Sequence, residues 1–199
     1  MPQPSTLPTI WVTGLPASGK RALAAAIAAG LRARNQSVEV IDSGRLRRTP
    51  LGATLGFSRD DRDTNVRRHA MAAAMLTRNG VVAVVSAVSP YRATRDALRA
   101  ELGNFVEVSV TTPPEACAAR DQSGNWARAY AGELTGFTGV DAPYEAPVSP
   151  EVTANLAEEP ADAAAVRVLA FLDARGSGGE NEDETDVLTA HLDELGYTD

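Results

Sequence analysis

The chain has 199 residues and a formal net charge of −7, a size that suits one compact domain with a core of its own. Its single cysteine, Cys117, excludes an internal disulfide and favours a reducing compartment, so we expect a cytoplasmic protein. The longest apolar run, around "VVAVVSAV", is too short to cross a bilayer, and "MPQPSTLPT" lacks the basic and apolar parts of a secretory signal, so we expect neither membrane insertion nor export.

The charge is unevenly placed along the chain. Eight of the 26 acidic residues lie in 176–199, a segment without lysine or arginine, so the body carries 18 acids against 19 bases. Between Arg45 and Arg95 the sequence has ten arginines against three aspartates, and we expect this segment to attract anions. We do not expect nucleic-acid binding, because the chain is acidic overall and a small phosphate-bearing ligand explains these arginines with fewer assumptions.

Strand and helix signals alternate from residue 9 onward. We predict strands at "TIWVTG" (9–14), "SVEVID" (37–42), "GVVAVVSAV" (80–88) and "NFVEVSVT" (104–111). The third is a continuous β-branched run, which is typical of a strand buried on both faces. We predict helices over 22–34, 59–78, 93–102 and 161–175, with Ser58 as the N-cap of the second. This alternation predicts an α/β fold of three layers, with a mostly parallel sheet covered by helices on both faces.

Two segments are predicted to lie outside this pattern. Residues 121–147 are rich in glycine, proline and turn residues, and they predict a long loop or lid. We place the end of the domain at residue 175, because "GSGGENEDETD" has the composition of a flexible acidic linker. The apolar residues of 187–197 could form one face of a short helix that docks on a partner protein or on the body, and a solvated tail is the alternative.

The pattern Gly14-x-x-x-x-Gly19-Lys20 fits a P-loop. Its glycines let backbone N–H groups turn towards phosphate oxygens, its lysine reaches the β- and γ-phosphates, and the following helix N-terminus favours anions. Lys20 is the only lysine beside 18 arginines, so the one compact point charge stands where the motif needs it. We predict that ATP is bound by the residues of this loop, namely Gly14, Ala17, Ser18, Gly19, Lys20 and Arg21.

Arg21 stands where a working P-loop has a serine or threonine whose hydroxyl ligates Mg²⁺. A cation does not ligate a cation, so the usual metal position is compromised. Three alternatives stay open. Other groups hold the metal, Arg21 replaces part of its charge, or phosphoryl transfer is lost.

Four further stretches, in family order, resemble the adenylylsulfate (APS) kinases. They are "LGFSRDDRDTNVRR" (55–68), "SAVSPYRATRD" (86–96), "VTTPPEACAARD" (110–121) and "GELTGFTGVDAPYEAP" (132–147). The resemblance runs from about Ile10 to Phe171. It implies a P-loop kinase fold and, usually, a homodimer. It also implies transfer of the γ-phosphate of MgATP to the 3′-hydroxyl of APS, which gives PAPS in sulfate assimilation.

The resemblance also implies the residues that bind the substrate, which are Arg47, Phe57, Arg62, Asn65 and Phe137. Arginines suit the phosphosulfate, and aromatic rings stack on adenine. For Arg62 the alternative is a solvated helix face, where it pairs with a nearby aspartate. Ser89 matches a serine near the phosphates, with the N-cap of the following helix as the alternative. Arg120 matches a contact to the adenine of ATP, with an ordinary arginine at a helix end as the alternative.

Departures from the family pattern lie in the parts that do the chemistry. After the second strand the family reads Asp-Gly-Asp, and here Gly44 replaces the second aspartate, to which the resemblance assigns a part in holding Mg²⁺ and in taking the substrate proton. Asp42 remains as the candidate metal ligand or base. In the lid the family has a run of basic residues that face the phosphates, whereas "WARAY" (126–130) has only Arg128.

Two functions follow from these patterns. In the first, the chain is an ATP-dependent phosphotransferase of the APS kinase type, in which Lys20 and Asp42 are catalytic and ATP and Mg²⁺ are the cofactors. In the second, it is an impaired pseudokinase that binds APS, PAPS or ATP as a regulatory module. The substrate-binding motifs favour the enzyme. Arg21, Gly44 and the depleted lid favour the binding module, because losing one charge clamp can cost on the order of 10³-fold in rate or more.

Overall fold

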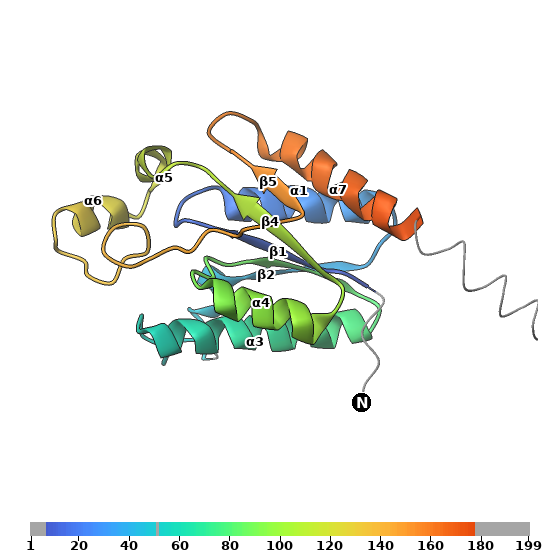
Figure 1. The fold of residues 1–199 in the computed structure, drawn as a ribbon, viewed down its shortest axis with the longest axis horizontal. Coiled ribbons are helices and arrows are strands. Elements are labelled where there is room, and N and C mark those ends of the chain that lie inside the picture. Colours follow the sequence, from blue (N-terminus) through green and yellow to red (C-terminus); the bar gives the residue numbers. More distant parts are fainter. Residues whose placement is uncertain (1–6, 51, 178–199) are drawn as a thin grey trace, which may run out of the picture.

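The computed structural model describes residues 7–50 and 52–177, so all but the first two residues of the predicted tail lie outside the described residues. Within the described part, five parallel strands form one sheet in the order β2-β3-β1-β4-β5 (Figure 1). The strands are β1 (Thr9–Gly14), β2 (Val38–Asp42), β3 (Val82–Ser86), β4 (Phe105–Val110) and β5 (Val152–Ala154). Because every strand runs the same way, the segments after their carboxyl ends meet at one edge of the sheet, where open α/β sheets bind ligands.

Helices cover both faces of this sheet. The longer ones are α1 (Lys20–Ala33), α3 (Arg59–Arg78), α4 (Arg92–Leu102) and α7 (Ala161–Ser177). Three short ones lie between them: α2 (Ser43–Leu46), α5 (Pro114–Arg120) and α6 (Asn125–Tyr130). In Figure 1, α1 and α7 lie on one face and α3 and α4 on the other. Figure 1 also shows α5 and α6 beyond the carboxyl ends of the strands, away from the end where α7 finishes.

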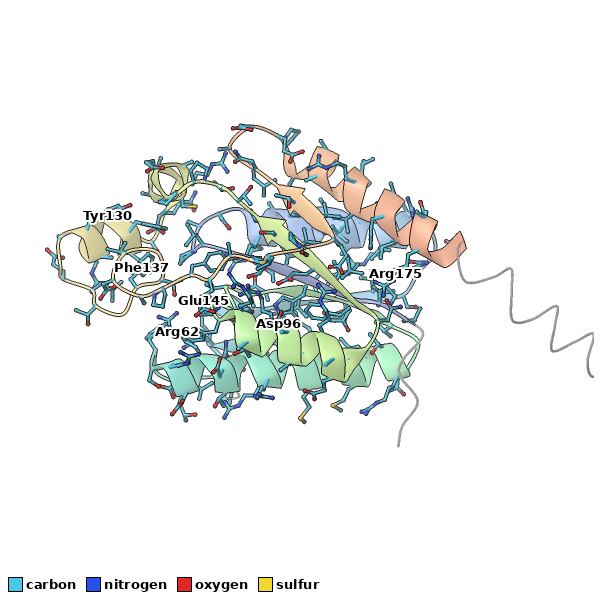
Figure 2. All side chains as sticks on the ribbon, in the orientation of Figure 1. Arg62, Asp96, Tyr130, Phe137, Glu145 and Arg175 are labelled. Carbon is cyan, nitrogen blue, oxygen red and sulfur yellow. The ribbon has the colours of Figure 1, made fainter. Side chains whose placement is uncertain are left out.

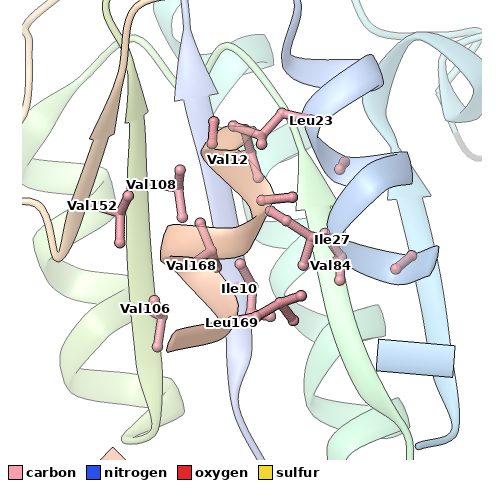
Figure 3. Close-up of a cluster of buried hydrophobic side chains, with 14 of the residues drawn as sticks. Ile10, Val12, Leu23, Ile27, Val84, Val106, Val108, Val152, Val168 and Leu169 are labelled. Carbon is pink, nitrogen blue, oxygen red and sulfur yellow. The ribbon is translucent and has the colours of Figure 1, made fainter. Parts of the chain in front are cut away.

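The alternation of side chains along β1 explains the two core layers. Ile10 and Val12 point to the face of α1 and α7, where they join one cluster of buried side chains (Figure 3). Trp11 points to the opposite face and packs in a second cluster with residues of α3 and α4. Helix α1 presents Leu23, Ile27 and Leu31 to the sheet at intervals of four residues, which is the spacing of one helix face.

The predicted fold class is confirmed, and the four predicted strands and four predicted helices are present with ends shifted by a few residues. Helix α1 begins at Lys20 rather than at residue 22, because Gly19 takes a left-handed conformation (φ 99°) that ends the loop. The segment 121–147, predicted as a loop or lid, contains helix α6. Strand β5 and helices α2 and α5 were not predicted. Among the described residues, no helix is long and apolar enough to cross a membrane.

Candidate functional site

A cavity of about 610 Å³ opens at the carboxyl edge of the sheet. Its walls come from the P-loop, α2, the first half of α3, the turn after β3, the segment after α5 and the lid segment around residue 137. Figure 2 shows Arg62 of α3 and Phe137 of the lid segment at the same end of the molecule. Most predicted site residues line this cavity: Ala17, Lys20, Arg21, Asp42, Arg47, Phe57, Arg62, Asn65, Ser89, Arg120 and Phe137.

The P-loop has the backbone that its glycines predict. Gly14 has φ 152°, and a Cβ there would lie 2.6 Å from the carbonyl oxygen of Val110 on β4, so a larger residue would collide with the neighbouring strand. Ala17 has a positive φ of 58°. Ser18 is fully buried, and its carbonyl accepts a hydrogen bond of 2.8 Å from the Thr112 hydroxyl. The loop is therefore fixed by β4 and by the segment that follows β4.

Lys20 is buried at the floor of the cavity. Its Nζ donates to the carbonyl oxygen of Leu15 at 2.6 Å and lies 3.4 Å from the Ser18 hydroxyl. Burial lowers the pKa of the ammonium to about 8, although the Asp42 carboxylate acts in the opposite direction. The amine is thus held inside the loop by loop oxygens, in reach of an anion that the loop would enclose.

Arg21 forms an ion pair with Asp42. Its Nε donates to Oδ2 of Asp42, and its Nη2 lies 3.4 Å from Oδ1. Asp42 also caps α2, because Oδ1 accepts the backbone N–H of Arg45 at 2.8 Å. Burial raises the pKa of the Asp42 carboxyl, but the hydrogen bonds from Arg21 and Arg45 outweigh it and hold the pKa below its ordinary value. Asp42 is therefore a carboxylate with occupied oxygens and a weak base.

At the other end of the cavity, arginines surround an aromatic ring. The guanidinium of Arg47 stacks 4.6 Å from the ring centroid of Phe57, and that of Arg62 lies 5.8 Å from it. Nη1 of Arg62 donates to the Thr138 hydroxyl at 2.5 Å, and Nη2 donates to the carbonyl of Gly136. The structure thus shows Arg62 tying α3 to the lid segment, and the alternative pairing with an aspartate on its own helix is wrong.

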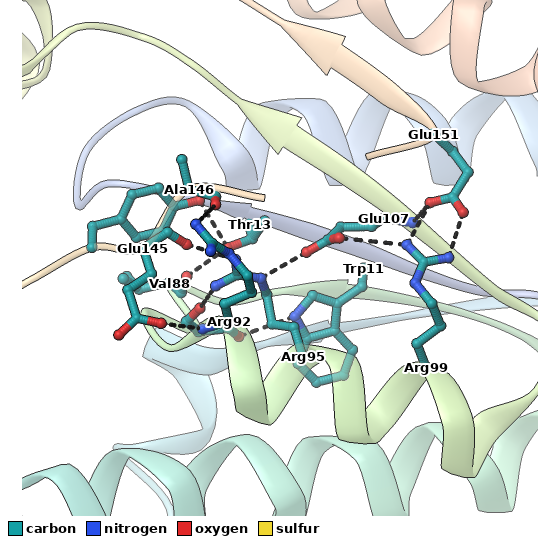
Figure 4. Close-up of polar contacts among 12 residues, drawn as sticks. Trp11, Thr13, Val88, Arg92, Arg95, Arg99, Glu107, Glu145, Ala146 and Glu151 are labelled. Atoms are coloured by element: carbon teal, nitrogen blue, oxygen red, sulfur yellow. Dashed lines mark hydrogen bonds and ion pairs between the residues drawn. The ribbon is translucent and has the colours of Figure 1, made fainter. Parts of the chain in front are cut away.

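Asn65 and Ser89 also line the cavity. Asn65 is buried, and its Nδ2 donates to the Ser43 hydroxyl at 3.1 Å. Ser89 accepts a hydrogen bond of 3.0 Å from the indole Nε1 of Trp11, and its carbonyl accepts one of 2.6 Å from Nη1 of Arg95. Figure 4 shows the same Arg95 side chain paired with Glu107. The N-cap of α4 is Tyr91, so the alternative that made Ser89 the cap is wrong.

The two remaining predicted residues differ in placement. Arg120 lies at the end of α5, as its alternative expected, lines the cavity and donates from Nη2 to the carbonyl of Leu156 at 2.6 Å. Its contact with the adenine of ATP stays a prediction. Arg128 is exposed on α6 and does not line the cavity. Trp126, the first aromatic of the lid sequence, is buried instead and donates from Nε1 to the carbonyl of Pro16 at 3.1 Å, which fixes α6 to the P-loop.

Comparison with known proteins agrees with this geometry. The family model of adenylylsulphate kinase matches residues 7–155. The chain belongs to the adenylylsulfate kinase family. An adenylyl-sulfate kinase from Synechococcus sp. (strain JA-3-3Ab) is 51% identical over 151 residues, which are 76% of this chain and 85% of that protein. Another, from Gloeothece citriformis (strain PCC 7424), is 45% identical over 168 residues, which are 84% of this chain and 95% of that protein.

Solved structures show the same relationship. The Mycobacterium tuberculosis APS kinase CysC in complex with AMPPNP and APS has a TM-score of 0.79 and 37% identity, covering 85% of this chain and 99% of its own. The hexameric APS kinase from Thiobacillus denitrificans has a TM-score of 0.64 and 30% identity, covering 88% of this chain and 30% of its own. The resemblance on which the substrate-binding residues were predicted is therefore a family relationship.

The magnesium ion that the adenylylsulfate kinase resemblance implies does not fit the residues at its usual place. Gly44 offers no side-chain ligand, Arg21 offers a cation, and both oxygens of Asp42 are already hydrogen-bonded. A Cβ at residue 44 would lie 3.1 Å from Nη2 of Arg21 and 3.2 Å from Oδ1 of Asp42. Among the described residues, no group of three His, Cys, Asp or Glu side chains could hold a metal ion.

Several residues that line the cavity of this chain were not predicted from the sequence, among them Ser43, Arg48, Asp121 and Thr138. Ser43 could have been found, because it directly follows a predicted strand at the edge where ligands bind. Thr138 gave no signal of its own. Its role depends on Arg62, which is 76 residues earlier in the chain.

Proposed function

We propose that the chain is an adenylylsulfate kinase, which transfers the γ-phosphate of ATP to the 3′-hydroxyl of APS and releases PAPS and ADP. One observation carries the proposal. A single cavity joins a P-loop with its buried Lys20 to the aromatic and arginine cluster around Phe57 and Phe137. The first half suits a triphosphate, and the second suits an adenine ring and a phosphosulfate.

The residues divide the work by their chemistry. Loop N–H groups and the Lys20 ammonium bind the β- and γ-phosphates of ATP, and Arg120 borders the adenine of ATP. Arg47 and Arg62 bind the anionic part of APS, and its adenine lies between the two phenylalanine rings. In the reaction the 3′-oxygen attacks the γ-phosphorus, and the bond from that phosphorus to the oxygen that bridges the β- and γ-phosphates of ATP breaks. That oxygen leaves as part of ADP, and the hydroxyl proton leaves to solvent.

Asp42 is a positioning residue in this proposal. Its lowered pKa makes it a poor acceptor for the hydroxyl proton, and its oxygens are used by Arg21 and by the N–H of Arg45. Phosphoryl transfer depends mainly on positioning and on charge stabilisation, so a strong base is not required of the protein. We derive no step through Mg²⁺, because the residues at its usual place do not fit the ion.

The test is formation of PAPS by the purified protein from ATP and APS, with Mg²⁺, with Mn²⁺ and with EDTA in parallel. We expect turnover above the level of a Lys20→Met variant, which removes the ammonium and keeps the length of the side chain. Turnover at the level of that variant, together with calorimetric binding of APS, would contradict the kinase. It would support the pseudokinase. That alternative is favoured because both oxygens of Asp42 already accept hydrogen bonds and Gly44 has no carboxylate.

The substrate, the oligomeric state and the location of the protein are part of this proposal. APS is the substrate, and a homodimer is supported by apolar side chains on the outer face of α3, where Met71 is 67% and Met75 51% exposed. Sedimentation of the protein with Met71→Glu and Met75→Glu would give a monomer if this face is the interface. A partner for the tail and a cytoplasmic location stay predictions.

A further inference from the structure

We infer that the guanidinium of Arg21, held by Asp42, takes the place of a divalent cation at the phosphates, so that the chain binds nucleotides without a metal ion. This inference rests on the proposed function only in requiring that a nucleotide binds at the P-loop. It does not depend on which molecule accepts the phosphate.

The first argument is position. Arg21 directly follows Lys20 in the first turn of α1, and Asp42 ends β2. In a P-loop enzyme, the hydroxyl of the residue after the lysine and an aspartate at the carboxyl edge of the sheet hold the metal from two sides. Here the side chains at these two places bind each other, and both line the cavity. The guanidinium therefore lies between the elements that would otherwise share an ion.

The second argument is space. Gly44 lies against the ion pair, since a Cβ at this residue would stand 3.1 Å from Nη2 of Arg21 and 3.2 Å from Oδ1 of Asp42. An aspartate at residue 44 would place a further carboxylate beside the guanidinium and compete with Asp42 for it. The two departures, Arg21 and Gly44, thus form one arrangement, in which the glycine leaves room for the arginine.

The third argument is charge. The cavity is lined by six basic side chains, from Lys20, Arg21, Arg47, Arg48, Arg62 and Arg120, and among the described residues only Asp42 and Asp121 bring carboxylates to it. A divalent cation placed beside these groups would be repelled, whereas a triphosphate would be attracted.

The fourth argument is hydrogen bonding. A guanidinium has five N–H donors, and the Asp42 contacts use two nitrogens, Nε and Nη2, so Nη1 keeps its donors for a phosphate oxygen. The Arg21 side chain is 71% exposed, so it can adjust to a phosphate without disturbing the core. Its charge is permanent, which suits it to the role of a fixed counter-charge.

The experiment is calorimetric binding of ADP and of AMPPNP to the whole chain, in excess EDTA and in excess Mg²⁺. For the natural sequence we expect the affinity in EDTA to equal or exceed that in Mg²⁺. Arg21→Ser should weaken binding in EDTA by about tenfold or more, the loss of a charged hydrogen-bond donor. The double variant Arg21→Ser with Gly44→Asp should regain affinity only when Mg²⁺ is present.

The matched control is Arg34→Ser. Arg34 follows α1, at the opposite end of that helix from Arg21, and it pairs with Asp173 at 2.5 Å on the surface. The Arg34→Ser substitution removes an exposed arginine ion pair of the same kind. We expect it to leave nucleotide affinity unchanged, both with and without Mg²⁺. Melting temperatures of all variants show whether they fold, and both positions are exposed enough for us to expect folded proteins.

Two results would overturn the inference alone. One is natural-sequence binding that is at least about tenfold tighter in Mg²⁺ than in EDTA. The other is metal-independent binding that Arg21→Ser leaves unchanged, because the charge would then come from other groups. Absence of binding to ADP and AMPPNP under both conditions would overturn the inference and the proposed function together.

Discussion

Lys20 illustrates how one residue sets the chemistry of this site. The sequence predicted its place, because the glycine spacing defines the loop and no other lysine exists in the chain. The sequence did not predict its electrostatics, since these depend on burial and on the carbonyl of Leu15 that receives its Nζ. A buried ammonium with a pKa of about 8 loses its charge within an accessible pH range.

We therefore expect ADP affinity to fall as the pH rises above about 8. Bound phosphates favour the charged amine and raise its pKa in the complex, so affinity is fully present below the pKa of the free protein. Above it, affinity falls by up to about tenfold per pH unit until the pKa of the complex is reached. Calorimetry across this range measures the slope. Lys20→Arg is the control, because arginine keeps its charge, and an equal slope in that variant would contradict the assignment to Lys20.

At the scale of elements, length and periodicity decided what could be predicted. The four long helices and four of the strands have regular apolar patterns, whereas α2 has four residues and β5 has three, too short for a pattern to emerge. The ion pair between Arg95 of α4 and Glu107 of β4, at 2.7 Å, also escaped prediction, because no local pattern links these two elements. Both side chains are buried, and Arg95 additionally holds the carbonyl of Ser89 in the cavity wall.

We expect Arg95→Met to lower the free energy of unfolding by about 3 kcal/mol or more, because it leaves the Glu107 carboxylate buried without its main partner. Arg99, which lies 3.4 Å from Glu107, compensates only in part. Arg92→Met is the matched control on the same helix. Arg92 is exposed, and its loss should cost about 0.5 kcal/mol or less. Urea unfolding measures both values, and equal losses in the two variants would contradict a special role for the buried pair.

For the molecule as a whole, the charge is divided between the body and the end of the chain. All eight acids of the predicted tail lie in 180–199, so residues 1–177 carry a formal net charge of +1 while the full chain carries −7. The sequence predicted this division from composition alone. It could not predict the cavity as a unit, because the cavity gathers residues from Pro16 to Thr138, and their meeting depends on the strand order of the sheet.

We expect removal of residues 178–199 to raise the rate of nucleotide association at low ionic strength, by roughly twofold or more. The body alone attracts an anionic ligand, and the tethered acids oppose that attraction at distances up to the Debye length. The difference should vanish at about 1 M salt, where that length is about 3 Å. Stopped-flow fluorescence of Trp126, which contacts the P-loop at Pro16, reports the association. A full-length variant with the eight tail acids changed to Asn and Gln separates charge from bulk. It should match the truncated chain, and a rate equal to that of the natural sequence at low salt would show that the acids exert no influence on the cavity.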